Sequence, residues 1–232
     1  MQSPWLVNTI GLLSRQGMAR RSALIKAVVG LTAAGLLAVL FLRSAQSARE
    51  APFTVERGHL TPWTLVLEPD ALGSWLALRP PADLAPPLGR QVFTRGGQSV
   101  NYPNPPAMPL VLQAEFDRAL AGTLMPDAVM NVARAAGLES VAFEARCMGY
   151  RRISEPGATR GVYFMVFDAP AFGQFRQQVA EELLRAGGNA SLFDPAALSP
   201  VLIVAALDED FSRWMPLRVN PASDCLAPIE VQ

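Results

Sequence analysis

Few residues in this sequence have side chains suited to enzymatic catalysis or metal binding. His59 is the only histidine, and Cys147 and Cys225 are the only cysteines, among 232 residues. A Ser-His-Asp arrangement needs a histidine to relay a proton, and structural zinc sites take four ligands that are mostly Cys or His. No neighbour of His59 in the sequence makes a convincing nucleophile or metal pair. We therefore predict no catalytic residues, no metal site and no cofactor, and interpret His59 as a surface residue.

A run of three acids, Asp208, Glu209 and Asp210, could in principle bind a metal ion. The run follows an apolar segment and precedes the sequence Phe211-Ser212-Arg213-Trp214. Acidic residues stabilise the first turn of a helix because they complement the positive end of the helix dipole. We therefore interpret these three acids as a helix cap.

Four arginines lie close together in the sequence, around a predicted β-hairpin: Arg146, Arg151, Arg152 and Arg160. If they share one side of the hairpin, they could bind a carboxylate, a phosphate or an anionic lipid headgroup, or contact a partner. The alternative is four solvated side chains that pair with Glu144 and Glu155.

An apolar segment near the N-terminus predicts a membrane-spanning helix over residues 23–43. Residues 27–42 contain no charged side chain. Twenty helical residues at about 1.5 Å each cover roughly 30 Å, the thickness of the hydrocarbon core. Four basic residues precede residue 27 and two lie between residues 43 and 50, so the positive-inside bias places the N-terminus in the cytoplasm.

This helix divides the chain into a cytoplasmic segment (1–22), a signal anchor (23–43), a juxtamembrane linker (44–56) and a periplasmic domain (57–232). The net charge is +5 over residues 1–50 and −5 over the remainder. One side of the anchor carries small residues that suit packing against another helix in lipid: Gly30, Ala34, Gly35 and Ala38. The predicted location is a bacterial inner membrane, with the bilayer itself as one partner.

Two cleaved export signals are alternatives to a retained anchor. Ala45-Gln46-Ser47 is a passable cleavage site for a general signal peptide. Arg20-Arg21 is similar to the start of a twin-arginine signal, and Met18 as an alternative start would place this pair at the N-terminus. Either signal would release a soluble exported protein.

Both cysteines follow the apolar segment, in the part of the chain predicted to be exported. An oxidising compartment favours disulfides, and the number of cysteines is even. We therefore predict a disulfide between Cys147 and Cys225, which would tie the C-terminal tail to a strand.

Hydrophobic periodicity predicts a mixed α+β domain. The expected strands cover residues 61–67, 141–153, 160–167 and 201–207, and the expected helices cover residues 110–121, 126–137 and 171–186. This order of elements is typical of a ferredoxin-like (split βαβ) two-layer sandwich.

A Pro-rich insertion over residues 79–109 interrupts this pattern. Eight prolines lie between residues 80 and 109. Because proline breaks helices and central strands, we expect no long helix there. The insertion is expected to be a covering loop, a partner-binding arm or a mobile connector.

The strands expected at 162–167 and 201–207 are apolar on both faces. A two-layer sandwich leaves one sheet face open to water, so something must cover the second face. Either the Pro-rich insertion or another protein would do so.

These observations favour a membrane-anchored extracytoplasmic domain that binds an integral or periplasmic protein, as an accessory or assembly subunit of a bacterial membrane complex. The alternative is an exported soluble enzyme or small anionic-ligand binder, with a pocket between the insertion and the sheet. In that case an arginine such as Arg151 or Arg152 would hold the anion. The balanced charge of 20 basic and 20 acidic residues argues against a nucleic-acid partner.

Overall fold

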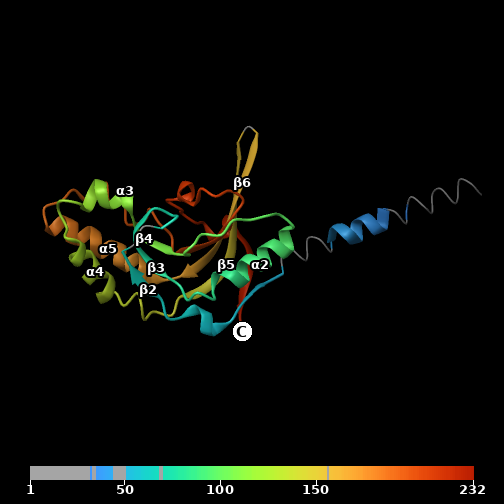
Figure 1. Ribbon diagram of the computed structural model, residues 1–232, viewed down its shortest axis with the longest axis horizontal. Helices are drawn as coiled ribbons and strands as arrows, with labels where there is room; N and C mark the ends of the chain where they lie inside the picture. The colour runs from blue at the N-terminus through green and yellow to red at the C-terminus, as the bar shows by residue number, and fades with distance from the viewer. Residues whose placement is uncertain (1–31, 33–34, 44–50, 68–69, 156) are drawn as a thin grey trace, which may run out of the picture. The chain divides into compact units, whose positions relative to one another are not determined.

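The computed structural model describes residues 32, 35–43, 51–67, 70–155 and 157–232 (Figure 1). The chain divides into two compact units, Met1–Ala48 and Arg49–Gln232. In the first unit, residues 35–43 are helical and exposed, and they include Gly35 and Ala38. Gly30, Ala34 and most of the predicted anchor lie outside the described residues. No helix within the described ranges is both long and apolar enough to cross a membrane.

The second unit contains a mixed five-stranded sheet in the order β1-β8-β5-β6-β7. Its long central hairpin is formed by β5 (Glu144–Glu155) and β6 (Ala158–Asp168), which pair from Glu144 and Asp168 to the turn. The other strands are shorter: β1 (Phe53–Val55), β7 (Val201–Ala206) and β8 (Cys225–Val231). All pairs are antiparallel except β1 with β8.

A separate antiparallel sheet contains β2 (Thr64–Val66), β3 (Ser74–Arg79) and β4 (Met108–Leu112). The expected strand at 61–67 therefore pairs with β3 and does not join the central hairpin. The fold is α+β, as predicted, but the strands form two sheets, so the ferredoxin-like arrangement is not confirmed.

Two of the predicted helices are present, and a third prediction was partly wrong. Helix α4 (Pro126–Ala135) and helix α5 (Pro170–Arg185) match the expected positions. The helix expected over 110–121 begins instead as β4, because Leu110, Val111 and Leu112 are buried and extend the β3 sheet. Helical structure begins only at α3 (Gln113–Glu115) and continues as a π-helix, η2 (Phe116–Leu120).

The Pro-rich insertion forms a twelve-residue helix, α2 (Ala85–Gly96), so the prediction of no long helix there was wrong. Pro86 and Pro87 stand in its first turn, where the proline nitrogen would have no helical acceptor anyway. Gly97, at a φ of 61°, ends the helix. The prolines therefore start this helix rather than break it.

The chain itself covers both faces of the strands that are apolar on both sides. On one face, Leu88 and Val92 of α2 join the core that contains Met165, Leu202 and Val204. On the other, residues from the segment after β7 pack against Val162, Phe164 and Ile203; these residues are Phe211 and Trp214 of the 3-10 helix η4 (Phe211–Trp214), and Leu217. Because the covering layer comes from two parts of the chain, these strands need no second protein to bury them.

A buried ion pair fixes α5 to the end of β4. The Arg176 side chain has no exposed surface, and its Nη2 lies 2.7 Å from Glu115 Oε1. Its other N–H groups donate to Glu115 Oε2 and to the carbonyl oxygens of Leu110, Asp194 and Pro195. All five guanidinium donors are therefore satisfied inside the protein.

Candidate functional site

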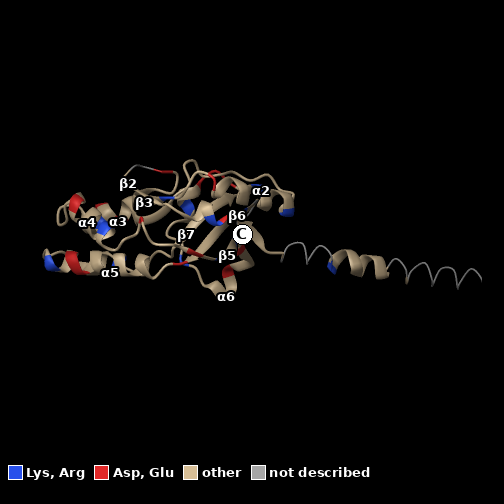
Figure 2. Cartoon of the chain, turned by 90° about the horizontal axis from the view of Figure 1, so that it is seen from below, with Lys and Arg blue, Asp and Glu red and all other residues tan. Residues whose placement is uncertain are grey.

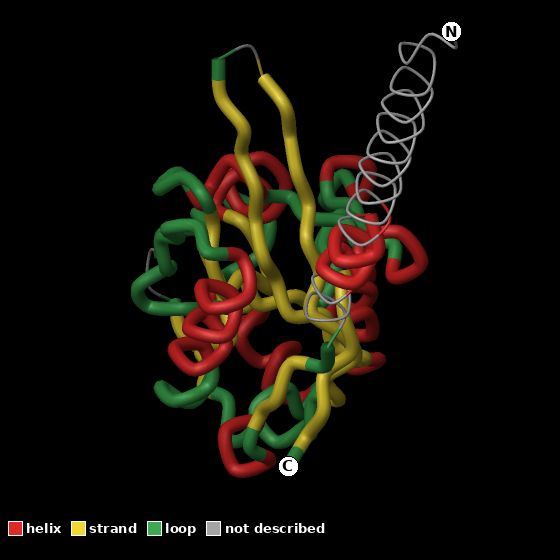
Figure 3. The backbone as a smooth tube through the Cα atoms, turned by 90° about the vertical axis from the view of Figure 1, so that its right-hand side faces the viewer, coloured by secondary structure: helices red, strands yellow, loops and turns green. Residues whose placement is uncertain are grey.

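The β5–β6 hairpin extends beyond the rest of the main sheet (Figures 1 and 3). β8 pairs with β5 only at Cys147–Gly149, and β7 pairs with β6 only at Val162–Val166. Residues 151–155 and 157–160, which we call the hairpin arm, therefore lie past both neighbouring strands. Successive side chains of a strand point to opposite faces. Of the predicted arginine cluster, Arg151 and Arg160 therefore lie on one face of the hairpin and Arg152 lies on the other.

Arg151 lies on the face of the arm that carries the C-terminal segment. Its Nη2 lies 2.7 Å from Asp224 Oδ2 and donates to the Arg218 carbonyl at 2.6 Å. Asp224 Oδ2 also accepts from the Asn220 backbone N–H at 3.0 Å, which closes the short helix α6 (Pro221–Asp224). Burial opposes ionisation of Asp224, but the Asn220 and Arg151 hydrogen bonds outweigh it and hold the pKa of this carboxyl below its usual value.

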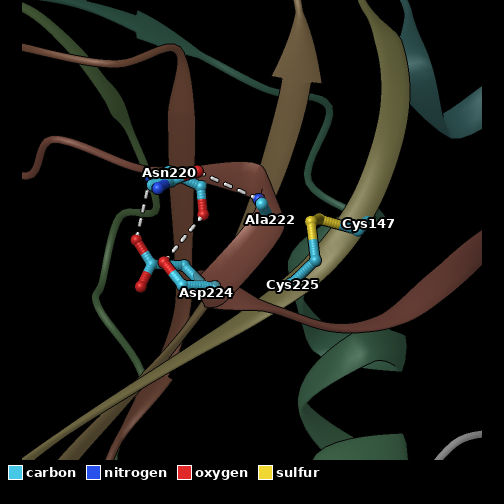
Figure 4. Close-up of a disulfide and its surroundings, with 6 residues drawn as sticks. Cys147, Asn220, Ala222, Asp224 and Cys225 are labelled. Atoms are coloured by element: carbon cyan, nitrogen blue, oxygen red, sulfur yellow. Dashed lines mark hydrogen bonds between the residues drawn. A yellow bond between two sulfur atoms is a disulfide. The ribbon is translucent and has the colours of Figure 1, made fainter.

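The disulfide lies beside this ion pair. Cys147 of β5 and Cys225, the residue after Asp224, are bonded to each other with their Cα atoms 5.8 Å apart (Figure 4). This agrees with the pairing predicted from the sequence. The disulfide and the Arg151–Asp224 pair together fasten the C-terminal segment to β5, so Arg151 has a structural role.

The other predicted candidates do not gather into one site. Arg160 lies 4.0 Å from Asp208 Oδ2, on the same face as Arg151, and Arg146 is exposed at the irregular step between Ala145 and Cys147. Asp210 immediately precedes η4 but makes no side-chain cap hydrogen bond to its backbone. The Ser212 hydroxyl and Arg213 hold the pKa of Asp210 below its usual value.

His59 lies on the 3-10 helix η1 (Arg57–Leu60), with Nε2 3.4 Å from Glu56 Oε2. Its side chain is 27% exposed, so it is less accessible than a free surface residue. No group of three or more His, Cys, Asp or Glu residues able to hold a metal ion occurs among the residues that the structure describes.

Arg152 points to the opposite face of the arm and lines a cleft of about 280 Å³, which we call the Arg95–Arg152 cleft. The facing wall is formed by Arg95 at the C-terminal end of α2 and by Gln98, which follows the helix cap. Tyr150 and Tyr163 lie side by side between the two walls, with ring centroids 4.6 Å apart. A Cβ atom on residue 161 would lie 2.7 Å from the Tyr150 hydroxyl, so Gly161 leaves the room that this ring needs.

The two arginines of the cleft differ in what holds them. Arg95 donates to the Ala51 and Pro52 carbonyls and lies 3.8 Å above the Phe53 ring. Burial lowers the pKa of Arg95 from its usual value. Arg152 is exposed and makes one hydrogen bond, a 3.3 Å contact from Nη2 to the Thr159 hydroxyl. No acidic residue is among the described residues that line the cleft.

A larger hollow of about 890 Å³, the Pro-rich cavity, lies at the other end of α2. Its walls are the first turns of α2 and residues 100–106, and Val204 of β7 also lines it. Asn101 anchors the wall through two backbone hydrogen bonds with Ala206, of 2.7 and 2.9 Å. Gly89 lets the Tyr102 ring lie against α2, because a Cβ atom there would be 2.2 Å from Tyr102 Cε1.

Sequence reasoning named Arg152 but missed Arg95, Tyr150 and Tyr163 as its neighbours. The Pro-rich insertion was treated as irregular chain, so the helix that carries Arg95 was not expected. Helical spacing from Leu88 to Val92, after the two prolines, was the signal that could have found it.

Comparison with known proteins adds no relative. No family model, curated protein or solved structure matches this chain.

Proposed function

We propose that the second unit is an extracytoplasmic binding domain that holds the oxyanion group of a ligand, a phosphate or a carboxylate, in the Arg95–Arg152 cleft. The charge of the cleft carries this proposal, because two arginines and no acid are found among its described lining residues. Two positive charges in a hollow attract an anion, and a guanidinium binds phosphate and carboxylate groups through paired hydrogen bonds.

The cleft residues have distinct roles in this proposal. Arg152 donates to the anion, because within the described part of the chain only its contact with Thr159 uses its N–H groups. Arg95 adds positive charge from the opposite wall, while its two carbonyl contacts hold it in place. The Tyr150 hydroxyl supplies a further donor. The lining residues include no carboxylate, histidine or cysteine within the described chain, so the proposal is one of binding and not of catalysis.

Thermal unfolding of the full chain with pyrophosphate or citrate tests this proposal. A ligand that binds only the folded state raises the melting temperature, by about 2–4 °C for each kcal/mol in a protein of this size. We expect at least one of the two anions to do so in the wild type. Arg152→Ala should abolish the shift, whereas Arg146→Ala, a matched change of an exposed arginine on the same strand, should leave it intact. No shift with either anion, or equal shifts in both variants, would overturn the proposal.

Binding to a protein partner is a second candidate, and the hairpin arm is the feature that favours it. Among the described residues, neither edge of the arm pairs with a further strand, and Ile153 on it is 39% exposed. Two-stranded ribbons are marginally stable alone, and a strand added from a partner would complete the ladder. An accessory subunit of a membrane complex would use the arm in this way. Recovery of a stoichiometric partner in mild detergent, lost when residues 153–158 are replaced by a two-residue turn, would support this candidate, and its absence would count against it.

We also propose that residues 23–43 anchor the domain at a bacterial inner membrane, with the N-terminus in the cytoplasm. The apolar segment and its basic flank support this location, as does a disulfide of the kind that persists in oxidising compartments. Mass spectrometry of the membrane fraction should find an intact N-terminus. Mature protein that begins near Ala48 in the soluble fraction would contradict the anchor.

A further inference from the structure

The Pro-rich cavity is separate from the Arg95–Arg152 cleft and has a different lining. Most of its wall is apolar, and five of its described lining residues are prolines: Pro80, Pro86, Pro103, Pro105 and Pro106. Its volume of about 890 Å³ lies within the range of roughly 300–1,000 Å³ that is usual for drug-sized ligands. The cavity therefore has room for an organic molecule and not only for a small ion.

The polar groups of the cavity favour a negatively charged ligand. Arg90 lies on α2 at the wall, and its side chain is exposed. None of the described lining residues is acidic, and the first turn of α2, whose residues Ala85 and Pro86 also line the cavity, contains no acid. The charge of Arg90 is therefore not offset by an acidic residue in the described part of the cavity wall.

The wall that faces Arg90 is held in a fixed position. Asn101 is bonded to the edge of β7 at both its backbone N–H and its carbonyl. Glycine inside a helix costs about 1 kcal/mol relative to alanine, and at position 89 its benefit is the close approach of the Tyr102 ring. The Tyr102 ring and the proline-rich residues 100–106 therefore form a fixed surface against which a flat apolar part of a ligand can pack.

We propose that the Pro-rich cavity binds an organic monoanion with an aromatic or aliphatic body. The anionic group lies at Arg90, and the body packs between the proline rings, Tyr102 and Val204. This assignment does not depend on the oxyanion proposed for the cleft, because the two sites share no lining residue.

Photolabelling of the full chain in lipid nanodiscs tests this site, because mass spectrometry identifies where the probe attaches. The probe is 4-benzoylbenzoate, which carries one carboxylate on a diaryl ketone, and 4-methylbenzophenone is its neutral counterpart. We expect saturable labelling of residues 80–106 by the carboxylate. The neutral counterpart should need at least about tenfold more probe, as expected for loss of one charge-assisted contact.

Three variants separate the expected contacts. Arg90→Glu should weaken labelling by the carboxylate at least about tenfold while leaving labelling by the neutral probe unchanged. Ala82→Trp, at an exposed position that lines the cavity, should fill the space and remove labelling by both probes. Arg134→Glu, an equal charge change on the exposed face of α4, should change neither. Equal labelling by the two probes, or labelling of residues 80–106 that survives Ala82→Trp, would overturn the proposal.

Discussion

Arg176 and Arg152 differ in how completely the protein satisfies their hydrogen-bond donors. Arg176 has no exposed surface, and its five N–H groups all donate to Glu115 or to backbone carbonyls. Arg152 is exposed and donates once, to Thr159. The difference separates an arginine that holds two elements together from one that keeps donors for a ligand.

The two arginines also differ in their surroundings: Arg176 lies in the core, and Arg152 lies on an exposed part of the hairpin. Arg176 packs over Phe193 and joins α5 to the end of β4 inside the core. Arg152 stands on the hairpin arm, past the neighbouring strands. Basic and acidic residues are interspersed over the described part of the second unit (Figure 2). Charge alone therefore does not single out Arg152; its unused donors together with its place beside Arg95 in the cleft do.

The largest expected effect is on stability, from Arg176→Ala. Removing one partner of a buried ion pair leaves an uncompensated charge, which costs about 3–5 kcal/mol. Urea unfolding should show this loss, whereas Arg185→Ala, at an exposed position on the same helix, should change stability by less than about 0.5 kcal/mol. A loss below about 1 kcal/mol for Arg176→Ala would remove the contrast with Arg152.

Removal of the disulfide should have the next largest effect. A bridge that closes a loop of 78 residues contributes about 4 kcal/mol by chain entropy, and native-state strain commonly reduces this value. We expect the Cys147→Ser/Cys225→Ser variant to lose about 2–4 kcal/mol, measured by urea unfolding without reductant. Two alkylatable thiols in the unreduced wild type would show that no bridge forms.

Arg151 should fall between Arg176 and Arg152, because it has an acidic partner but is partly exposed. Arg151→Ala should cost about 1 kcal/mol at neutral pH. The pKa of Asp224 is lowered in the folded state, so its contribution is present above the pKa of an unfolded aspartate, about 3.9, and is lost as pH falls through the folded value. The difference between wild type and Asp224→Asn should therefore shrink in acid. A stability difference between wild type and Asp224→Asn that stays constant with pH would contradict an ion pair between Arg151 and Asp224.

The smallest effect on stability is expected for Arg152→Ala, within about 0.5 kcal/mol of the wild type. Its single contact with Thr159 contributes little. The same variant should lose the thermal shift with pyrophosphate or citrate. Marked destabilisation without loss of ligand binding would show that Arg152 has a structural role like that of Arg176.

Local patterns predicted the elements that depend on neighbours in sequence. The hydrophobic spacing in residues 126–137 and 171–186 and the apolar run at 201–207 correspond to α4, α5 and β7. The hairpin and the cysteine pair were also anticipated. These features follow from periodicity and from chemistry that the residues carry by themselves.

The features that the sequence did not predict depend on contacts between residues far apart in the chain. Leu110 to Leu112 have helical spacing with later residues, but pairing with β3 makes them a strand. Burial of the apolar strands was expected to require the insertion or another protein, and the segment around Phe211 and Trp214 supplies one of the two layers. The partner of Arg176 is 61 residues away, and Arg95 reaches the cleft only through α2. Apart from the Leu88–Val92 spacing that indicates α2, none of these contacts leaves a local pattern.

The central claim is that Arg152 is available to a ligand and that Arg176 is not. The most direct measurement is the arginine Nε–H spectrum of the full chain by ¹H–¹⁵N NMR during titration with pyrophosphate and then citrate, with signals assigned from Arg152→Ala and Arg176→Lys. We expect the Arg152 signal to move and saturate with at least one anion while the Arg176 signal stays in place. An Arg152 signal that does not move, or that moves only together with every exposed arginine, would contradict it.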